Sequence, residues 1–203
     1  TQAKASGSVT FADIEAEAIR FEEAEPSIIA IRGTGAASDL DESALVKFKV
    51  TDINGNAVSD ARVNFSLAKR VGGLALYCAD DIFCDYATSA DSAAGRSSRA
   101  TDLSGLDGIV SARVMSGSVA TPVRVLAHID TNRNGALDDG EPASNSKSLV
   151  VTTGLPDQNS LSVSADVLNI EGAYEADGKI STITVRMADK FNNPVPDGTP
   201  ATL

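Results

Sequence analysis

Residues 50–65 read VTDINGNAVSDARVNF, and residues 187–203 read MADKFNNPVPDGTPATL. The two stretches have the same residue at four positions that are separated by one constant interval of 137: Asp52 with Asp189, Asn56 with Asn193, Val58 with Val195, and Asp60 with Asp197. Four matches at one interval predict an internal repeat of about 137 residues. Arrays of repeats usually act through extension and contact rather than through chemistry.

Each copy of this phrase follows a stretch in which apolar and polar residues alternate. The apolar positions are Val46, Phe48 and Val50 before the first copy, and Ile183, Val185 and Met187 before the second. Because successive side chains of a strand point to opposite faces, the alternation predicts half-buried strands. Asn54-Gly55 and Asn192-Asn193 tolerate positive φ and predict a tight turn after each strand. Val63, Phe65 and Leu67 then resume the alternation after the first turn.

The pattern Asp-x-x-Gly-Asn-x-Val-x-Asp, followed by an alternating strand, resembles the signature of invasin- and intimin-type bacterial immunoglobulin-like domains. Further stretches carry the same resemblance: TDLSGLDGI at 101–109, VSARVM at 110–115, PVRVLA at 122–127 and LPDQNS at 155–160. The first copy departs from the usual pattern at Ala57 and Ser59, where prolines commonly stand. The resemblance implies an all-β protein of tandem immunoglobulin-like β-sandwich repeats, one complete and one truncated, from a large bacterial surface protein.

The resemblance also divides the chain into three parts. Residues 1–25 are expected to end a preceding repeat or to form a linker, 26–153 to be a complete domain, and 154–203 to begin a second domain, so that the sequence is interpreted as an excised fragment. Residues 1–24 are expected to be extended, although a helix is the alternative on propensity alone. Strands are expected near 27–33, 43–52, 61–68, 73–78, 107–116, 121–130 and 146–153, the seven of an immunoglobulin sandwich.

Composition favours a packed, acidic, extracellular module. Hydrophobic residues make up 42% of the chain and charged residues 22%, which is sufficient for packed cores. The net charge of −11 disfavours binding to nucleic acid and to anionic membrane surfaces. No apolar run approaches the roughly 18 residues of a membrane span.

The only two cysteines, Cys78 and Cys84, are expected to form a local disulfide in an exported protein. Closing so short a loop would contribute about 2 kcal/mol; two free buried thiols are the alternative. A zinc site is disfavoured because His128 is the sole histidine. The disulfide would hold Tyr77, Ile82, Phe83 and Tyr86 in a lobe of residues 76–99. Tyr77, Phe83 and Tyr86 are candidate partner contacts, and a small core beneath the loop is the alternative.

Residues 130–141, DTNRNGALDDGE, match the twelve-residue calcium-loop pattern position by position. Gly135 occupies the position of the sharp turn, and Leu137 occupies the place where such loops bury an apolar side chain. Strands rather than helices are expected on both sides of the loop, and an acidic turn without metal is the alternative. The expected calcium ligands are the side chains of Asp130, Asn132, Asn134, Asp138 and Glu141 and the backbone carbonyl of Ala136.

Enzymatic function is disfavoured. A Ser-His-Asp or Cys-His arrangement would have to use His128, which lies in an apolar strand. Two function classes remain: a structural and adhesive repeat on the bacterial outer surface, or an accessory carbohydrate-binding module of a secreted enzyme. The expected partners are neighbouring repeats and a protein or glycan receptor on a host or cell surface. The absence of tryptophan favours the first class, because sugar-binding sandwiches commonly use exposed aromatic platforms.

Overall fold

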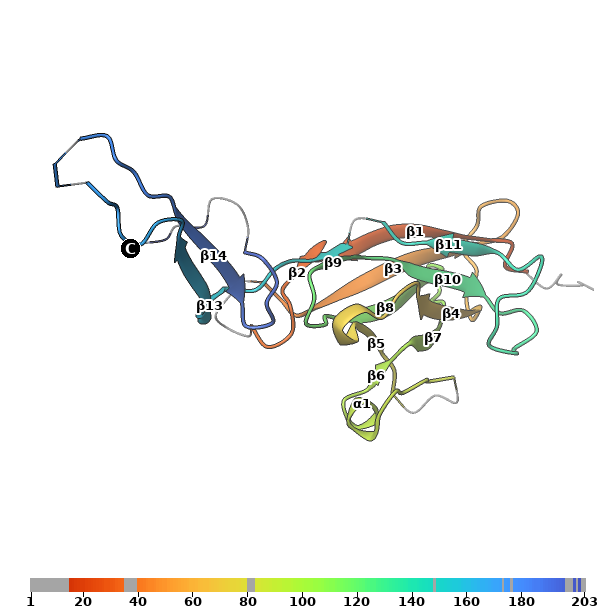
Figure 1. The fold of residues 1–203 in the computed structure, drawn as a ribbon. Helices are drawn as coiled ribbons and strands as arrows, with labels where there is room; N and C mark the ends of the chain where they lie inside the picture. Colours follow the sequence, from red (N-terminus) through yellow and green to blue (C-terminus); the bar gives the residue numbers. More distant parts are fainter. Residues whose placement is uncertain are drawn as a thin grey trace, which may run out of the picture.

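The computed structural model describes residues 15–34, 40–79, 83–147, 149–172, 174–175, 177–195, 199 and 201. Within these residues the regular structure is almost entirely β, with one short helix, α1 (Ser89–Ala93), and one 3-10 turn at Val71–Gly73. Figure 1 shows two packed layers of strands, and the hairpin of β13 and β14 lies beyond one end of them.

The first layer is a five-stranded antiparallel sheet in the order β1, β3, β8, β5, β6. Its strands are β1 (Ala18–Glu25), β3 (Ser43–Thr51), β8 (Ile109–Met115), β5 (Ala75–Tyr77) and β6 (Arg96–Ser97). The predicted alternation is confirmed in β3, where Val46, Phe48 and Val50 are fully buried and the residues between them are partly exposed.

The second layer contains β11 (Ala143–Asn145), β10 (Val125–Ile129), β4 (Arg62–Leu67) and β7 (Arg99–Leu103), in that order. A smaller sheet is formed by β2 (Ile28–Ile29), β12 (Leu149–Val151) and β9 (Thr121–Val123). Only Arg124 separates β9 from β10 along the chain. The β2–β12 pair is parallel, whereas β9 and β12 are antiparallel.

The core lies between the two layers and identifies the fold as an immunoglobulin-like β-sandwich. Phe48 of the first layer packs against Phe65 of the second, with ring centroids 5.8 Å apart. Phe21 meets Phe48 edge-on at the same centroid distance within the first layer. The fully buried side chains come from both layers and from the smaller sheet, and include Ile29, Val46, Val50, Val63, Val110, Val114 and Leu149.

The turn predicted from the repeated phrase is confirmed in the first copy (residues 52–58, the first turn). Asp52 Oδ1 accepts hydrogen bonds from the backbone N–H groups of Asn54 and Asn56, each at 2.8 Å, and Oδ2 accepts one from Asn56 Nδ2 at 2.9 Å. Gly55 has a φ of +84°, as its place in the turn requires.

The second copy (residues 189–195, the second turn) repeats this arrangement bond for bond. Asp189 Oδ1 accepts from the backbone N–H groups of Phe191 and Asn193, at 2.8 and 3.0 Å, and Oδ2 accepts from Asn193 Nδ2 at 2.8 Å. Asn192, the counterpart of Gly55, has a φ of +62°. The same Asp and Asn in the same spacing therefore build the same local structure twice.

The hairpin before the second turn pairs β13 (Pro156–Ala165) with β14 (Ile183–Asp189). Val163 lies opposite Val185 in this hairpin, as Phe21 lies opposite Phe48 in the sandwich. No strand of a second layer covers this face within the described residues, and Val163 is 52% exposed.

Three features of the sandwich differ from the expectations. We expected residues 1–25 to end a preceding repeat or to form a linker, but β1 pairs with β3 from Ala18 to Glu25, so the first layer begins before residue 26; residues 1–14 lie outside the described part. The strands β6, β7 and β11 were not predicted, since their residues show little alternation. The expected strand at 121–130 is divided into β9 and β10.

Candidate metal centre and disulfide lobe

The loop of residues 130–141 leaves the sandwich at the end of β10 and returns at β11, so strands lie on both sides of it as expected. Asp130 anchors its start and is only 3% exposed. Asp130 Oδ1 accepts a hydrogen bond from the backbone N–H of Asn134 at 3.1 Å, and Oδ2 accepts one from the backbone N–H of Gly135 at 3.0 Å. Gly135 adopts a φ of +78°, as the sharp turn of a calcium loop requires.

Three of the six expected ligands converge in the middle of the loop. Asn132 Nδ2 and Asn134 Nδ2 donate hydrogen bonds to Asp138 Oδ2, at 2.7 and 2.5 Å. These bonds, that of Asn132 first, hold the pKa of Asp138 below its ordinary value. The side chains of Asn132, Asn134 and Asp138 are therefore held together by hydrogen bonds within the loop.

Glu141, the last residue of the loop, accepts hydrogen bonds from residues near the start and near the end of the loop. Glu141 Oε1 accepts from the N–H and hydroxyl of Thr131, at 3.0 and 3.1 Å, and Oε2 accepts from the N–H of Asp138 at 3.1 Å. The loop therefore keeps its ends together through Glu141.

The donor set fits a hard divalent cation in type and order, with carboxylate, amide and carbonyl oxygens from one short segment. The structure does not draw all six groups to one point. Within the described residues no three His, Cys, Asp or Glu side chains form a metal-binding cluster. The convergent group is Asn132, Asn134 and Asp138, whereas Asp130 and Glu141 bond to backbone amides, and Ala136 donates its N–H to Asn134 Oδ1 at 2.7 Å. Calcium binding thus stays a prediction.

Two residues outside the loop support it and were not identified from the sequence. Asn64 of β4 is buried and donates through Nδ2 to Asp130 Oδ2 at 2.6 Å. Thr101 of β7 donates its hydroxyl to Asn64 Oδ1 at 2.8 Å. This chain of bonds fixes the first carboxylate of the loop to the sheet. The only sign of this hydrogen-bonded chain in the sequence is that Asn64, a polar residue, stands between Val63 and Phe65.

The disulfide lobe (residues 76–99) projects from the sandwich and carries α1 (Figure 1). Cys78 and Cys84 form the expected disulfide, with their Cα atoms 5.9 Å apart. Thr88 begins α1 as its N-cap, and its side chain accepts a hydrogen bond from the backbone N–H of Asp91.

The aromatic residues of the lobe make contacts within the protein, as the alternative of a small core requires. Tyr86 donates its hydroxyl to the Cys78 carbonyl at 2.8 Å. The Phe83 ring stacks under the Arg62 guanidinium, 4.7 Å from Cζ, and lies so near Gly135 that a Cβ there would come within 2.5 Å of the ring. Tyr77 remains 48% exposed. Ile82 lies outside the described residues.

Leu137 and His128 line the same cavity beside the loop. Leu137 was expected to be buried by the loop but is 45% exposed, because it lies at the rim of a shallow cavity with Phe83 rather than in the core. His128 is only 4% exposed on β10, and its side chain lines the same cavity. Both ring nitrogens of His128 lack hydrogen-bond partners among the described residues.

No family model matches the chain, and no curated protein matches it either. The chain is similar to a solved structure titled "FdeC, a Novel Broadly Conserved Escherichia coli Adhesin Eliciting Protection against Urinary Tract Infections", at 18% sequence identity and a TM-score of 0.45. The match covers 88% of this chain and 42% of the FdeC chain, so this chain spans less than half the length of that one. The assignment of the fold rests on the sheets described above.

Proposed function

We propose that this chain is a structural and adhesive immunoglobulin-like repeat of a bacterial cell-surface or secreted protein, of the invasin and intimin type. The observation that carries this proposal is the recurrence of one side-chain-bound turn at a constant interval, each time after a matching strand pair. A module that recurs in one chain is suited to extension and contact.

Two further properties support a place outside the cell. The Cys78–Cys84 disulfide is the kind of bond that persists in oxidising compartments. The net charge of −11 suits a well-solvated surface. Among the described residues no helix is long and apolar enough to cross a membrane.

The proposal also assigns no reaction to the chain. Its sole histidine, His128, is only 4% exposed and lines a cavity with residues of the loop 130–141 and with Phe83 of the disulfide lobe. The carboxylates of the loop accept hydrogen bonds from the loop's own backbone and amide groups. These contacts suit a structural role better than a catalytic one.

In this proposal calcium rigidifies the tip of the β10–β11 hairpin. Asp130, Asp138 and Glu141 carry three negative charges within one twelve-residue segment, and a bound cation would neutralise their repulsion. Extracellular modules bind calcium at about 10⁻⁴ to 10⁻³ M, which is adequate where calcium is millimolar. The oxygens assigned to it are those of Asp130, Asn132, Asn134, Ala136, Asp138 and Glu141.

The proposed location is tested on intact cells that produce the full-length protein. A non-permeant biotinylating reagent, followed by capture and peptide mapping, should label the exposed Lys69, Lys147 and Lys179 without breaking the cells. Labelling only after lysis would contradict the proposal. A cytoplasmic protein of the same cells, which should remain unlabelled, is the control.

The adhesive class is separated from the carbohydrate-binding module by two binding measurements. Beads coated with the purified chain should bind host cells, and a glycan array should give no specific signal. Specific retention on one glycan class, lost when the chain is denatured, would favour the carbohydrate-binding module. If neither surface retains the chain, its role in the array is spacing alone.

A further inference from the structure

The sandwich has two ends that carry different loops. The amino-terminal end carries the first turn, the loop 104–108 and the loop 130–141. The carboxy-terminal end carries residues 31–34, 117–119 and 152–155, from which the chain continues into β13. In Figure 1 the hairpin of β13 and β14 lies beyond the carboxy-terminal end.

The second turn is docked on the carboxy-terminal end of the sandwich. Asp189 is fully buried, and its Oδ2 accepts a hydrogen bond from the Gly154 N–H at 3.0 Å. Asn193 Nδ2 donates to the Ser118 carbonyl at 2.9 Å, and Lys190 Nζ donates to the Gly33 carbonyl. The residues that shape the turn therefore also bind it to the preceding sandwich.

Two glycines permit this close approach. A Cβ on Gly154 would lie 2.7 Å from Ile31 Cδ1 and 3.0 Å from Asp189 Oδ2. A Cβ on Gly33, whose φ is +81°, would lie 2.7 Å from Lys190 Nζ. The carboxy-terminal end is therefore shaped to receive an Asp-Lys-x-x-Asn turn.

The first turn has the same internal bonds and is not docked on any described residue outside its own sandwich. In the second turn Asn193 Nδ2 donates to the Ser118 carbonyl. The corresponding group of the first turn, Asn56 Nδ2, donates only to Asp52 Oδ2 within the described residues. Ile53, the counterpart of Lys190, is 83% exposed. Asp52 is partly exposed, whereas Asp189 is fully buried.

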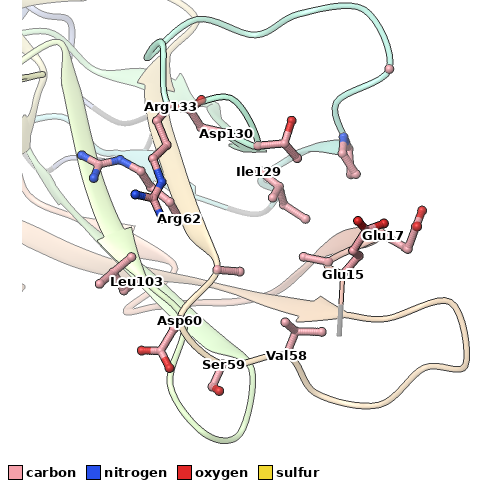
Figure 2. A pocket seen from close by; sticks show the side chains of 15 residues that line it. Glu15, Glu17, Val58, Ser59, Asp60, Arg62, Leu103, Ile129, Asp130 and Arg133 are labelled. Atoms are coloured by element: carbon pink, nitrogen blue, oxygen red, sulfur yellow. The ribbon is translucent and has the colours of Figure 1, made fainter. Parts of the chain in front are cut away.

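An exposed loop and a cavity lie at the same end of the sandwich as the first turn. Leu106 of the neighbouring loop 104–108 is 92% exposed, and this loop packs on the turn through Gly108 and Ala57. A cavity of about 810 Å³ at the same end includes Val58 of the turn in its lining. Figure 2 shows Ser59 and Asp60 on one side of it and Arg133 on the other. Ile53 and Leu106 are two largely exposed aliphatic side chains at this end, and exposed apolar groups of this kind mark a contact surface.

We propose that the first turn is the docking surface for the carboxy-terminal end of another repeat of this construction. This inference rests on the proposed function, because it requires a tandem array. Asp52 Oδ2 would accept from the linker N–H that corresponds to Gly154. Asn56 Nδ2 would donate to the carbonyl that corresponds to Ser118. Ile53 would make an apolar contact where Lys190 makes a hydrogen bond.

The full chain extended by one repeat tests the proposal. Residues 1–160 are followed directly by residues 19–203, because Leu161 faces Met187 as Ile19 faces Val50. Isotope labelling confined to the upstream unit allows amide exchange to be measured at its Gly154. This amide should exchange at least about tenfold more slowly than in the variant with Asp52→Ala and Asn56→Ala downstream, since a hydrogen bond to a carboxylate is lost.

Substitutions at Ile53 of the downstream unit sharpen the test. Ile53→Lys should slow exchange at the upstream Gly154 further by restoring the contact of Lys190, and Ile53→Glu should accelerate it. The matched control is each variant in the unextended chain, where protection of the β3 and β8 amides should not change. That control separates loss of docking from loss of folding.

Equal exchange at the upstream Gly154 in all extended chains would overturn the proposal. Self-association of the unextended chain that Ile53→Glu abolishes would also overturn it, because the surface would then belong to a second copy. The labelling test on intact cells can succeed when this test fails, since exposure on a cell does not require docked repeats. The two failures are therefore distinguishable.

Discussion

The β1–β3 pair of the sandwich and the β13–β14 hairpin have similar strand pairing and opposite surroundings. Val50 and Phe48 are fully buried, but their counterparts Met187 and Val185 are only partly buried. Opposite them, Ile19 is buried, whereas Leu161 is 44% exposed. The difference is the second layer, which covers the first pair and not the hairpin within the described residues.

This comparison separates what a segment does alone from what its neighbours provide. The alternation and the Asp–Asn turn are present in both pairs, so strand and turn need only local residues. Burial of the apolar face depends on strands distant in sequence, such as β4 and β10. Most stability of the sandwich should therefore come from the packing of its layers.

The largest expected difference between the two pairs is in the cost of removing an apolar side chain. Phe48→Ala should lower the free energy of unfolding by about 3–5 kcal/mol, since it leaves a cavity between Phe21 and Phe65. The matched variant Val185→Ala should cost no more than about 0.5 kcal/mol. Urea unfolding followed by circular dichroism measures both. Equal costs would mean that the hairpin face is covered in solution.

The disulfide should stabilise the sandwich and leave the hairpin unaffected. The variant with Cys78→Ser and Cys84→Ser should lose about 2 kcal/mol by the chain-entropy estimate, because its unfolded state gains freedom. Amide exchange should accelerate in the disulfide lobe and remain unchanged in β13 and β14. Alkylation of two thiols in unreduced wild-type protein would contradict the presence of the bond.

Calcium should also stabilise the sandwich rather than the hairpin, by a smaller free energy than the disulfide does. At free calcium of about ten times the dissociation constant, stabilisation should be about 1.4 kcal/mol. Glu141→Gln should weaken binding most, and Asp139→Asn, which changes a neighbouring acid outside the predicted ligand set, is the control. Calorimetry and melting with and without chelator measure these effects. Indifference of the melting temperature to chelator would refute the site.

The smallest effect should be a loosening of the hairpin junction in acid. Burial acts to raise the pKa of Asp189, but hydrogen bonds from Asn193, Gly154 and Phe191 lower it below its ordinary value of 3.8. The stability it contributes is therefore complete above pH 3.8 and is lost as pH falls through the lower native pKa. The Gly154 amide should lose protection in this range, and Asp189→Asn should flatten the response. Protection that is independent of pH in the wild type would contradict this account.

The sequence predicted the elements whose information is local. The strand β3 and both turns follow from alternation and from the spacing of Asp and Asn. Strand β7 could not be found in this way, because Arg99–Leu103 has little alternation and pairs with β4, more than thirty positions away. The place of β1 was missed for a similar reason, since its pairing with β3 is not visible in its own residues.

The spacing of residues 130–141 predicted a set of calcium ligands, but it could not predict Asn64 and Thr101, the residues outside the loop that hold Asp130. The twelve-residue spacing identified all the residues assigned to the loop. The bonds from Thr101 through Asn64 to Asp130 join three separate segments, so no local pattern contains them. Leu137 was placed wrongly because the cavity beside it is formed by Phe83, from an insertion whose fold the spacing does not specify.

The Phe83 ring lies between the disulfide and the loop, since it is next to Cys84 in the chain and packs on Gly135. The energies of the two features should therefore not add. A double-mutant cycle between the disulfide and Glu141 should give a nonzero interaction energy, which Phe83→Ala should abolish. The coupling must be reciprocal. If the disulfide raises the affinity for calcium by some factor, then bound calcium must raise the equilibrium constant for forming the disulfide by the same factor.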